Sequence, residues 1–198
     1  ASIRRGMVSG ERIFAILDTP EEEDEGKIEL SEENFKGDIE FKSVWFAYQA
    51  DEWVLRDVSF RVSAGHTIAI VGATGAGKTS IINLLNRFYE IQKGEILIDG
   101  INIREIRKES LRRHIGIVLQ DVFLFSGTIK DNIRLGSEEI TDESIRNASM
   151  HVNAHRFIEA LLGGYNEEVK ERGATLSSGQ RQLLAYARAL AFDPPILV

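Results

Sequence analysis

The order of apolar and polar residues along this chain predicts one helix followed by a region of strands. Residues 2–17 carry apolar side chains at helical spacing, and Asp18-Thr19-Pro20 ends that predicted helix. Residues 38–48 and 57–63 are rich in β-branched and aromatic residues, which predicts two strands joined by a polar turn. A short apolar run over residues 67–71 predicts a further, buried strand.

The rest of the chain alternates short strands with longer helices. Asp99-Gly100 lies between two apolar runs and predicts a hairpin over residues 94–103. Residues 115–119 form an apolar run that suits a buried parallel strand, and Ile196 begins another strand. Helical spacing is found over the ranges 77–88, 128–134, 142–162 and 178–191. Together these elements predict an α/β fold.

A glycine-rich loop follows the predicted strand 67–71 directly, and a predicted helix follows the loop. This strand–loop–helix context identifies G-x-x-x-x-G-K-T as a phosphate-binding loop. Lys78 would reach the β- and γ-phosphates of a nucleotide, and Thr79 would place a hydroxyl on Mg²⁺. A glycine-rich turn that binds nothing is the alternative, and the flanking elements disfavour it. The predicted nucleotide-binding residues are Gly72, Thr74, Gly75, Ala76, Gly77, Lys78, Thr79 and Ser80.

Composition narrows the class of protein. The chain has 198 residues, 43% of them hydrophobic and 28% charged, which is an ordinary globular balance. Its net charge of −7 disfavours a nucleic-acid surface, so no nucleic-acid partner is expected. The absence of cysteine excludes disulfides and zinc–thiolate sites and fits a reducing cytosol. The acidic run 21–26 is interpreted as a solvated connector, with the folded domain starting near Gly37.

A second motif, Leu176-Ser177-Ser178-Gly179-Gln180, opens the predicted helix 178–191. Ser177 is a good N-cap residue and Gln180 stands three positions later, which is the pattern of a capping box. Capping would be true whatever the function. The same helix N-terminus, with a hydroxyl and a glycine, can also accept a γ-phosphate.

With these motifs together, the chain resembles the nucleotide-binding domain of ATP-binding cassette (ABC) transporters, and the exporter branch, which carries drugs, lipids or peptides, fits best. Residues 119–133 resemble its Q-loop segment, and Glu171-Arg172-Gly173 resembles its X-loop. Residues 44–48 resemble the strand that ends in an adenine-stacking aromatic. The resemblance covers the whole chain.

The resemblance implies a domain organisation. It implies a P-loop NTPase fold with a mixed core sheet, an antiparallel β subdomain and a helical subdomain at about 126–176. Residues 1–36 would be the end of the last transmembrane-helix extension plus an acidic linker, and 37–198 a partial ABC domain. An ordinary amphipathic helix is the alternative for residues 1–17.

The resemblance also implies roles for single residues. Tyr48 would stack on adenine, although packing within its strand is the alternative. Gln120 would contact Mg²⁺ or the attacking water, and the loop after it would touch a transmembrane domain. Glu171-Arg172-Gly173 would lie near the same membrane-domain contact, with an exposed ion pair as the alternative. A second nucleotide-binding domain, facing the first head to tail, would have its ATP contacted by Ser177, Ser178, Gly179 and Gln180.

This sequence departs from the family pattern in two ways. Ser178 stands where the family usually has a second glycine, which is expected to weaken that contact at most. The resemblance places the Mg²⁺-binding aspartate, the catalytic glutamate and the switch histidine after Val198, so the fold is expected to be incomplete at its C-terminus. All four histidines precede the signature and none can be the switch: His66, His114, His151 and His155. Residues 1–198 alone are therefore expected to hydrolyse no more ATP than a Lys78→Ala control.

The leading hypothesis is an ATPase domain that couples ATP binding and hydrolysis to substrate export at the cytoplasmic face of the cell membrane. A soluble ABC-type ATPase of DNA repair or the ribosome is one alternative. Such proteins usually carry long insertions between the motifs, whereas Lys78 and Ser177 are only about a hundred residues apart. The catalytically degenerate half of a heterodimeric transporter is another alternative, and a generic P-loop kinase is the weakest. The sequence leaves open the transported substrate and the choice between homodimer and heterodimer.

Overall fold

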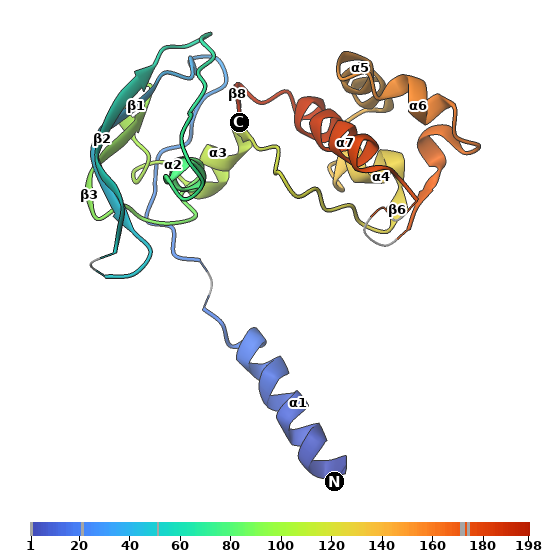
Figure 1. Cartoon of the computed structure of the whole chain (residues 1–198), viewed down its shortest axis with the longest axis horizontal. Coiled ribbons are helices and arrows are strands. Elements are labelled where there is room, and N and C mark those ends of the chain that lie inside the picture. The colour runs from blue at the N-terminus through green and yellow to red at the C-terminus, as the bar shows by residue number, and fades with distance from the viewer. Residues whose placement is uncertain (1, 21, 51, 171–172, 174) are drawn as a thin grey trace.

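Figure 1 shows the computed structural model of the chain, which describes residues 2–20, 22–50, 52–170, 173 and 175–198. Two lobes lie side by side, and helix α1 (Ser2–Leu17) extends away from both of them. The helix predicted over residues 2–17 is therefore confirmed. The apolar side chains Ile13, Phe14, Ile16 and Leu17 are exposed. In the described part of the chain, no helix is both long and apolar enough to cross a bilayer.

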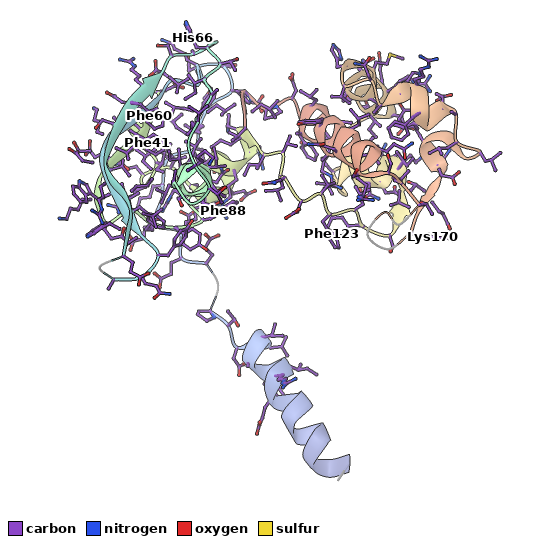
Figure 2. All side chains as sticks on the ribbon, viewed as in Figure 1. Phe41, Phe60, His66, Phe88, Phe123 and Lys170 are labelled. Carbon is purple, nitrogen blue, oxygen red and sulfur yellow. The ribbon has the colours of Figure 1, made fainter. Side chains whose placement is uncertain are left out.

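The first lobe is an antiparallel sheet backed by two helices. Its strand order is β2 (Trp53–Val62), β1 (Ile39–Ala47), β3 (Lys93–Ile98) and β4 (Ile101–Asn102). Phe41 in the interior strand β1 pairs with Phe60 and Ile96 on either side. Figure 2 shows Phe41 and Phe60 on this sheet, and their rings stack at 4.5 Å. The antiparallel β unit and its Asp99-Gly100 turn are confirmed. The two helices are α2 (Lys78–Leu85) and α3 (Lys108–Arg113).

The second lobe is mainly helical and has its own apolar core. Helix α7 (Ser178–Ala191) contributes Leu184, Ala187 and Ala191 to that core, so the helical unit reaches beyond residues 126–176. The helix predicted over residues 178–191 is confirmed at both ends. The elements are β6 (Gly127–Thr128), α4 (Ile129–Arg134), α5 (Asp142–His151), α6 (His155–Glu159), the 3-10 turn η1 (Gly164–Asn166), β7 (Glu168–Val169) and α7 (Ser178–Ala191).

The prediction of a strand over residues 67–71 is wrong. These residues form no regular strand, and Val71 is 87% exposed. A parallel strand needs hydrogen-bonded neighbours, and within the described residues the parallel core pairing joins only β5 (Ile115–Gly116) to β8 (Ile196–Leu197). That pairing is extended by the hydrogen bond from Val118 N to Val198 O. The apolar run of residues 67–71 pairs with neither of these two strands.

Backbone conformation explains two shorter corrections. The helix predicted over 77–88 ends at Leu85, since Arg87 adopts a left-handed φ of 51° that a continuing helix does not allow. The helix predicted over 142–162 is divided into α5 and α6, and Asn153 between them has φ 60°. Asparagine tolerates that conformation better than most residues, which makes it a natural break point.

The acidic segment before the sheet is exposed over residues 22–25, as predicted for a solvated connector, but it also forms contacts with the first lobe. Glu22 forms ion pairs with Arg112, at 2.7 Å, and with Lys108, at 3.0 Å. Asp24 accepts the first backbone N–H of α3, from Lys108, at 2.8 Å. Ile28 then forms a parallel bridge with Ile106. We call residues 22–30 the acidic clasp, because they fasten the chain after α1 to the helices of the first lobe.

The clasp predicts a measurable pH dependence. The hydrogen bond from Arg112 is the main cause that lowers the pKa of Glu22 from its usual 4.5 to about 2. A lowered folded-state pKa contributes stability above about pH 4.5 that is lost as the pH falls toward 2. Because Glu22 is 49% exposed, solvent screens the ion pair. We therefore expect it to contribute about 0.5–1 kcal/mol to the free energy of unfolding. The melting-temperature difference between the wild type and Glu22→Gln should therefore shrink between pH 6 and about pH 3.5. A constant difference would contradict the ion pair.

Candidate phosphate and base site

The phosphate loop adopts a backbone that requires glycine at two positions. Gly75 and Gly77 have φ of 83° and 86°, a region that other residues rarely occupy. A Cβ on Gly77 would lie only 2.7 Å from Leu55 Cδ2, so the loop is also pressed against the sheet. Helix α2 begins at Lys78 with no side-chain cap. Its first N–H groups therefore remain available to an anion.

Lys78 is held within the loop itself. Its ammonium Nζ donates to the backbone oxygens of Gly72 and Ala73, both at 2.9 Å. An ammonium has three N–H donors, so one donor is left for a further acceptor. The ammonium therefore lies within the loop, and its role in binding phosphate stays a prediction of the motif.

Tyr48, the predicted base-stacking residue, lies against the phosphate-loop helix. Its hydroxyl is 3.0 Å from Ser80 Oγ. The ring packs edge-on against Phe46 and Tyr89, with centroid distances of 4.7 and 4.9 Å. Tyr48 nevertheless stays 47% exposed, which leaves ring surface for a ligand. Folding therefore brings together the aromatic residue and the loop that the sequence places 24 residues apart.

The signature residues lie in the other lobe. Ser177 caps α7: its Oγ accepts from Gln180 N at 3.2 Å, and its own N–H donates to Gln180 Oε1 at 2.9 Å. The predicted capping box is therefore confirmed. Ser178 and Gly179 are exposed at the start of the helix, and a Cβ on Gly179 would meet nothing within 4 Å. The N-terminal end of α7 is therefore exposed to solvent.

The remaining predicted residues are Gln120 and Glu171-Arg172-Gly173. Gln120 is exposed, two residues after the last β5–β8 hydrogen bond, and none of the hydrogen bonds of the described residues joins it to the phosphate loop. It begins the segment that crosses to the helical lobe, on which Figure 2 labels Phe123. Glu171 and Arg172 lie outside the described residues. Gly173 is buried with φ 68°, and a Cβ there would lie 2.8 Å from Leu124 Cδ1.

The residues fit a nucleotide better than they fit a metal alone. The uncapped α2 terminus, the left-handed glycines and the spare donor of Lys78 all suit phosphate oxygens. Thr79 and Gln120 offer only neutral oxygens, and the described residues contain no group of three His, Cys, Asp or Glu side chains that could hold a metal. Mg²⁺ usually binds through a carboxylate or two together with substrate phosphates. A magnesium ion at Thr79 would therefore depend on the nucleotide.

Sequence reasoning missed two residues of this site. Asn83 Nδ2 donates to the Tyr48 hydroxyl at 3.4 Å, and Tyr89 supports the Tyr48 ring. Ser80 and Asn83 are three positions apart in a helix, which places them on one face. That spacing could have indicated a polar face on α2, but nothing in the local pattern points it at Tyr48.

Comparison with known proteins agrees with the motifs. The family model for ABC transporters matches residues 55–198. The probable multidrug resistance ABC transporter ATP-binding/permease protein YheH of Bacillus subtilis is 51% identical over 198 residues, covering 100% of this chain and 29% of that protein. The fatty acid ABC transporter ATP-binding/permease protein of Mycobacterium bovis is 45% identical over 197 residues, covering 100% of this chain and 31% of that protein.

A solved structure supports the same relationship. It is a bacterial Atm1-family ABC exporter with ATP bound, which matches with a TM-score of 0.85 and 40% identity over 98% of this chain and 34% of that one. This chain thus spans about a third of the length of the relatives that it matches. Because the family model covers most of the chain and the relatives align along all of it, this protein belongs to the ABC transporter family, as an ATP-binding domain of that family.

Proposed function

We propose that this chain is the ATP-binding domain of an ABC exporter, and that it binds ATP at the phosphate loop with the base on Tyr48. The observation that carries the proposal is the placement of the Lys78 ammonium inside a glycine loop that opens an uncapped helix. The loop would bind the phosphates through backbone N–H groups, and Lys78 would neutralise their charge. Thr79 and Gln120 would hold Mg²⁺ once the nucleotide is bound.

The wider assembly is part of the same proposal. Two copies, or this domain and a similar one, would face head to tail, so that Ser178 and Gly179 at the exposed start of α7 meet the partner's nucleotide. The relatives are ATP-binding/permease proteins, which supports a transmembrane partner. That partner would be contacted through the Gln120 loop and Glu171-Arg172-Gly173. The domain would then work at the cytoplasmic face of a membrane. ATP hydrolysis in that assembly would drive export.

Lysine replacement tests the nucleotide site. Lys78→Ala removes the charged donor at the loop and should weaken Mg-ATP binding by about 10- to 100-fold, measured by titration calorimetry on this chain. Lys36→Ala is the matched control, because Lys36 is exposed and lies outside the loop. It should bind ATP like the wild type. Repeating the wild-type titration in EDTA tests the magnesium part of the proposal, which requires weaker binding without the metal.

Two results would contradict the proposal. Equal ATP affinity in the wild type and in Lys78→Ala would show that the loop is not the nucleotide site. The export part has its own test in the native gene: the coding sequence that adjoins this segment should encode membrane-spanning helices. A gene that encodes tandem cassettes or coiled-coil insertions instead would favour the soluble ATPase alternative.

A further inference from the structure

The hydroxyl of Tyr48 is the meeting point of three side chains. It lies 3.0 Å from Ser80 Oγ, and Asn83 Nδ2 donates to it at 3.4 Å. A hydroxyl can accept one hydrogen bond while it donates another, so Tyr48 can accept from Asn83 and donate to Ser80 at the same time. Ser80 and Asn83 both belong to α2, the helix that begins at the phosphate loop.

The contact between Tyr48 and Ser80 involves a buried hydroxyl group. Ser80 is only 4% exposed, and its hydroxyl contacts Tyr48. Buried polar groups are nearly always hydrogen-bonded, because an unpaired one loses its contacts to water without replacement. Removing the tyrosine hydroxyl would therefore leave Ser80 without this partner. The pair links the strand end that carries Tyr48 to the helix that carries the phosphate loop.

The ring of Tyr48 is also held at its sides. Phe46 and Tyr89 contact it at interplanar angles of 80° and 88°, which are the edge-on arrangements that aromatic pairs prefer. Phe46 is itself fully buried, so on this side the Tyr48 ring packs against the core of the first lobe. Tyr89 follows α2 along the chain and contacts Phe46 as well, with centroids 5.8 Å apart. The tyrosine is thus restrained at its hydroxyl and around its ring while much of it remains exposed.

We propose that Ser80, Asn83 and Tyr89 are positioning residues for the base of a bound nucleoside triphosphate. They fix the Tyr48 ring relative to the phosphate loop, so that the base and phosphate sites keep one spacing. Ser80 acts through its hydroxyl on Tyr48, in addition to any contact its backbone makes with phosphate. This inference rests on the proposed function, because it assumes that Tyr48 stacks on the base.

The test compares a ligand that has a base with one that has none. Calorimetry on this chain would measure Mg-ATP and Mg-tripolyphosphate binding to Tyr48→Phe, Ser80→Ala and the double variant. Each single change should weaken ATP binding by about 2- to 10-fold, the range expected for loss of one hydrogen bond. The double variant should be no weaker than the weaker single variant, because both changes remove the same contact. In Tyr48→Phe, tripolyphosphate affinity should change less than about twofold. In Ser80→Ala it should fall less than ATP affinity does, because Ser80 also belongs to the phosphate loop.

The helical lobe offers matched controls. Tyr165 has a hydroxyl bonded to His155 Nδ1 at 2.9 Å, and the buried Ser149 donates to Ile145 O within α5. Tyr165→Phe and Ser149→Ala therefore remove similar groups away from the phosphate loop and should leave both affinities unchanged. Tyr89→Leu should behave like Tyr48→Phe, with weaker ATP binding and unchanged tripolyphosphate binding.

The outcomes separate this inference from the proposed function. If tripolyphosphate binding falls as much as ATP binding in Ser80→Ala, Ser80 acts on phosphate and the positioning role is wrong. Effects that multiply in the double variant would also overturn it, since they would mean two independent contacts. If Lys78→Ala leaves ATP binding unchanged, the proposed function itself fails. If only Lys78→Ala weakens ATP binding, the nucleotide site stands and the positioning inference fails alone.

Discussion

Replacement of Gly77 by alanine should destabilise the first lobe and abolish nucleotide binding together. Gly77 has φ 86°, and its new Cβ would lie 2.7 Å from Leu55 Cδ2. A left-handed backbone costs alanine about 1–2 kcal/mol, and a methyl group forced into a packed site costs about 1–3 kcal/mol. We therefore expect the free energy of unfolding in urea to fall by about 2–5 kcal/mol. The start of α2 would have to move, so the phosphate cradle would no longer form.

Two other glycines separate backbone strain from the clash. Gly65 and Gly75 have φ of 74° and 83°, but a Cβ on either would meet nothing within 4 Å. Gly65→Ala and Gly75→Ala should therefore lose only about 1–2 kcal/mol each. Gly65→Ala should also leave ATP binding intact. In a Leu55→Ala background, Gly77→Ala should lose less stability than it does alone, because the clashing methyl group is gone. An unchanged loss would contradict the contact between Gly77 and Leu55.

The parts of the fold that the sequence predicted best carry their signals locally. Helix α7 was predicted with both of its bounds, because the Ser177–Gln180 capping box marks its start and Asp193-Pro194 follows its end. The Asp99-Gly100 hairpin is similar, since both turn residues take the positive φ that such a turn requires. In each case a few neighbouring residues determine the backbone.

Other features depend on contacts between distant residues, which a local pattern does not contain. The apolar run of residues 67–71 predicts burial, but a strand also needs a neighbour, and the run does not say which segment pairs with it. The acidic run was interpreted as solvated because like charges usually repel and stay in water. The described residues 22–25 are exposed, but Glu22 also pairs with Arg112, 90 residues away, and the local pattern does not show this contact. The contact between Tyr48 and Ser80 spans 32 residues and was equally out of reach.

Gly26→Ala should detach the acidic clasp from the first lobe. A Cβ on Gly26 would lie 2.2 Å from the backbone oxygen of Ile106, which cannot move aside as a flexible side chain could. That oxygen already accepts from Arg87 Nη1 at 2.8 Å, so moving Ile106 would also disturb a buried arginine. The segment should therefore leave its position and lose the Lys27 and Ile28 hydrogen bonds to Glu105 O. We expect a loss of about 2–3 kcal/mol in stability.

Hydrogen exchange and limited proteolysis would show where the change occurs. In Gly26→Ala, the amides of residues 27 and 28 should exchange faster, and a glutamate-specific protease should cut near Glu22 sooner than in the wild type. Gly10→Ala is the matched control: it lies in α1, a Cβ there would meet nothing within 4 Å, and alanine should stabilise the helix by about 1 kcal/mol. It should leave exchange at residues 27 and 28 unchanged. If Gly26→Ala also leaves exchange at residues 27 and 28 unchanged, the acidic clasp does not hold the chain after α1 against α3.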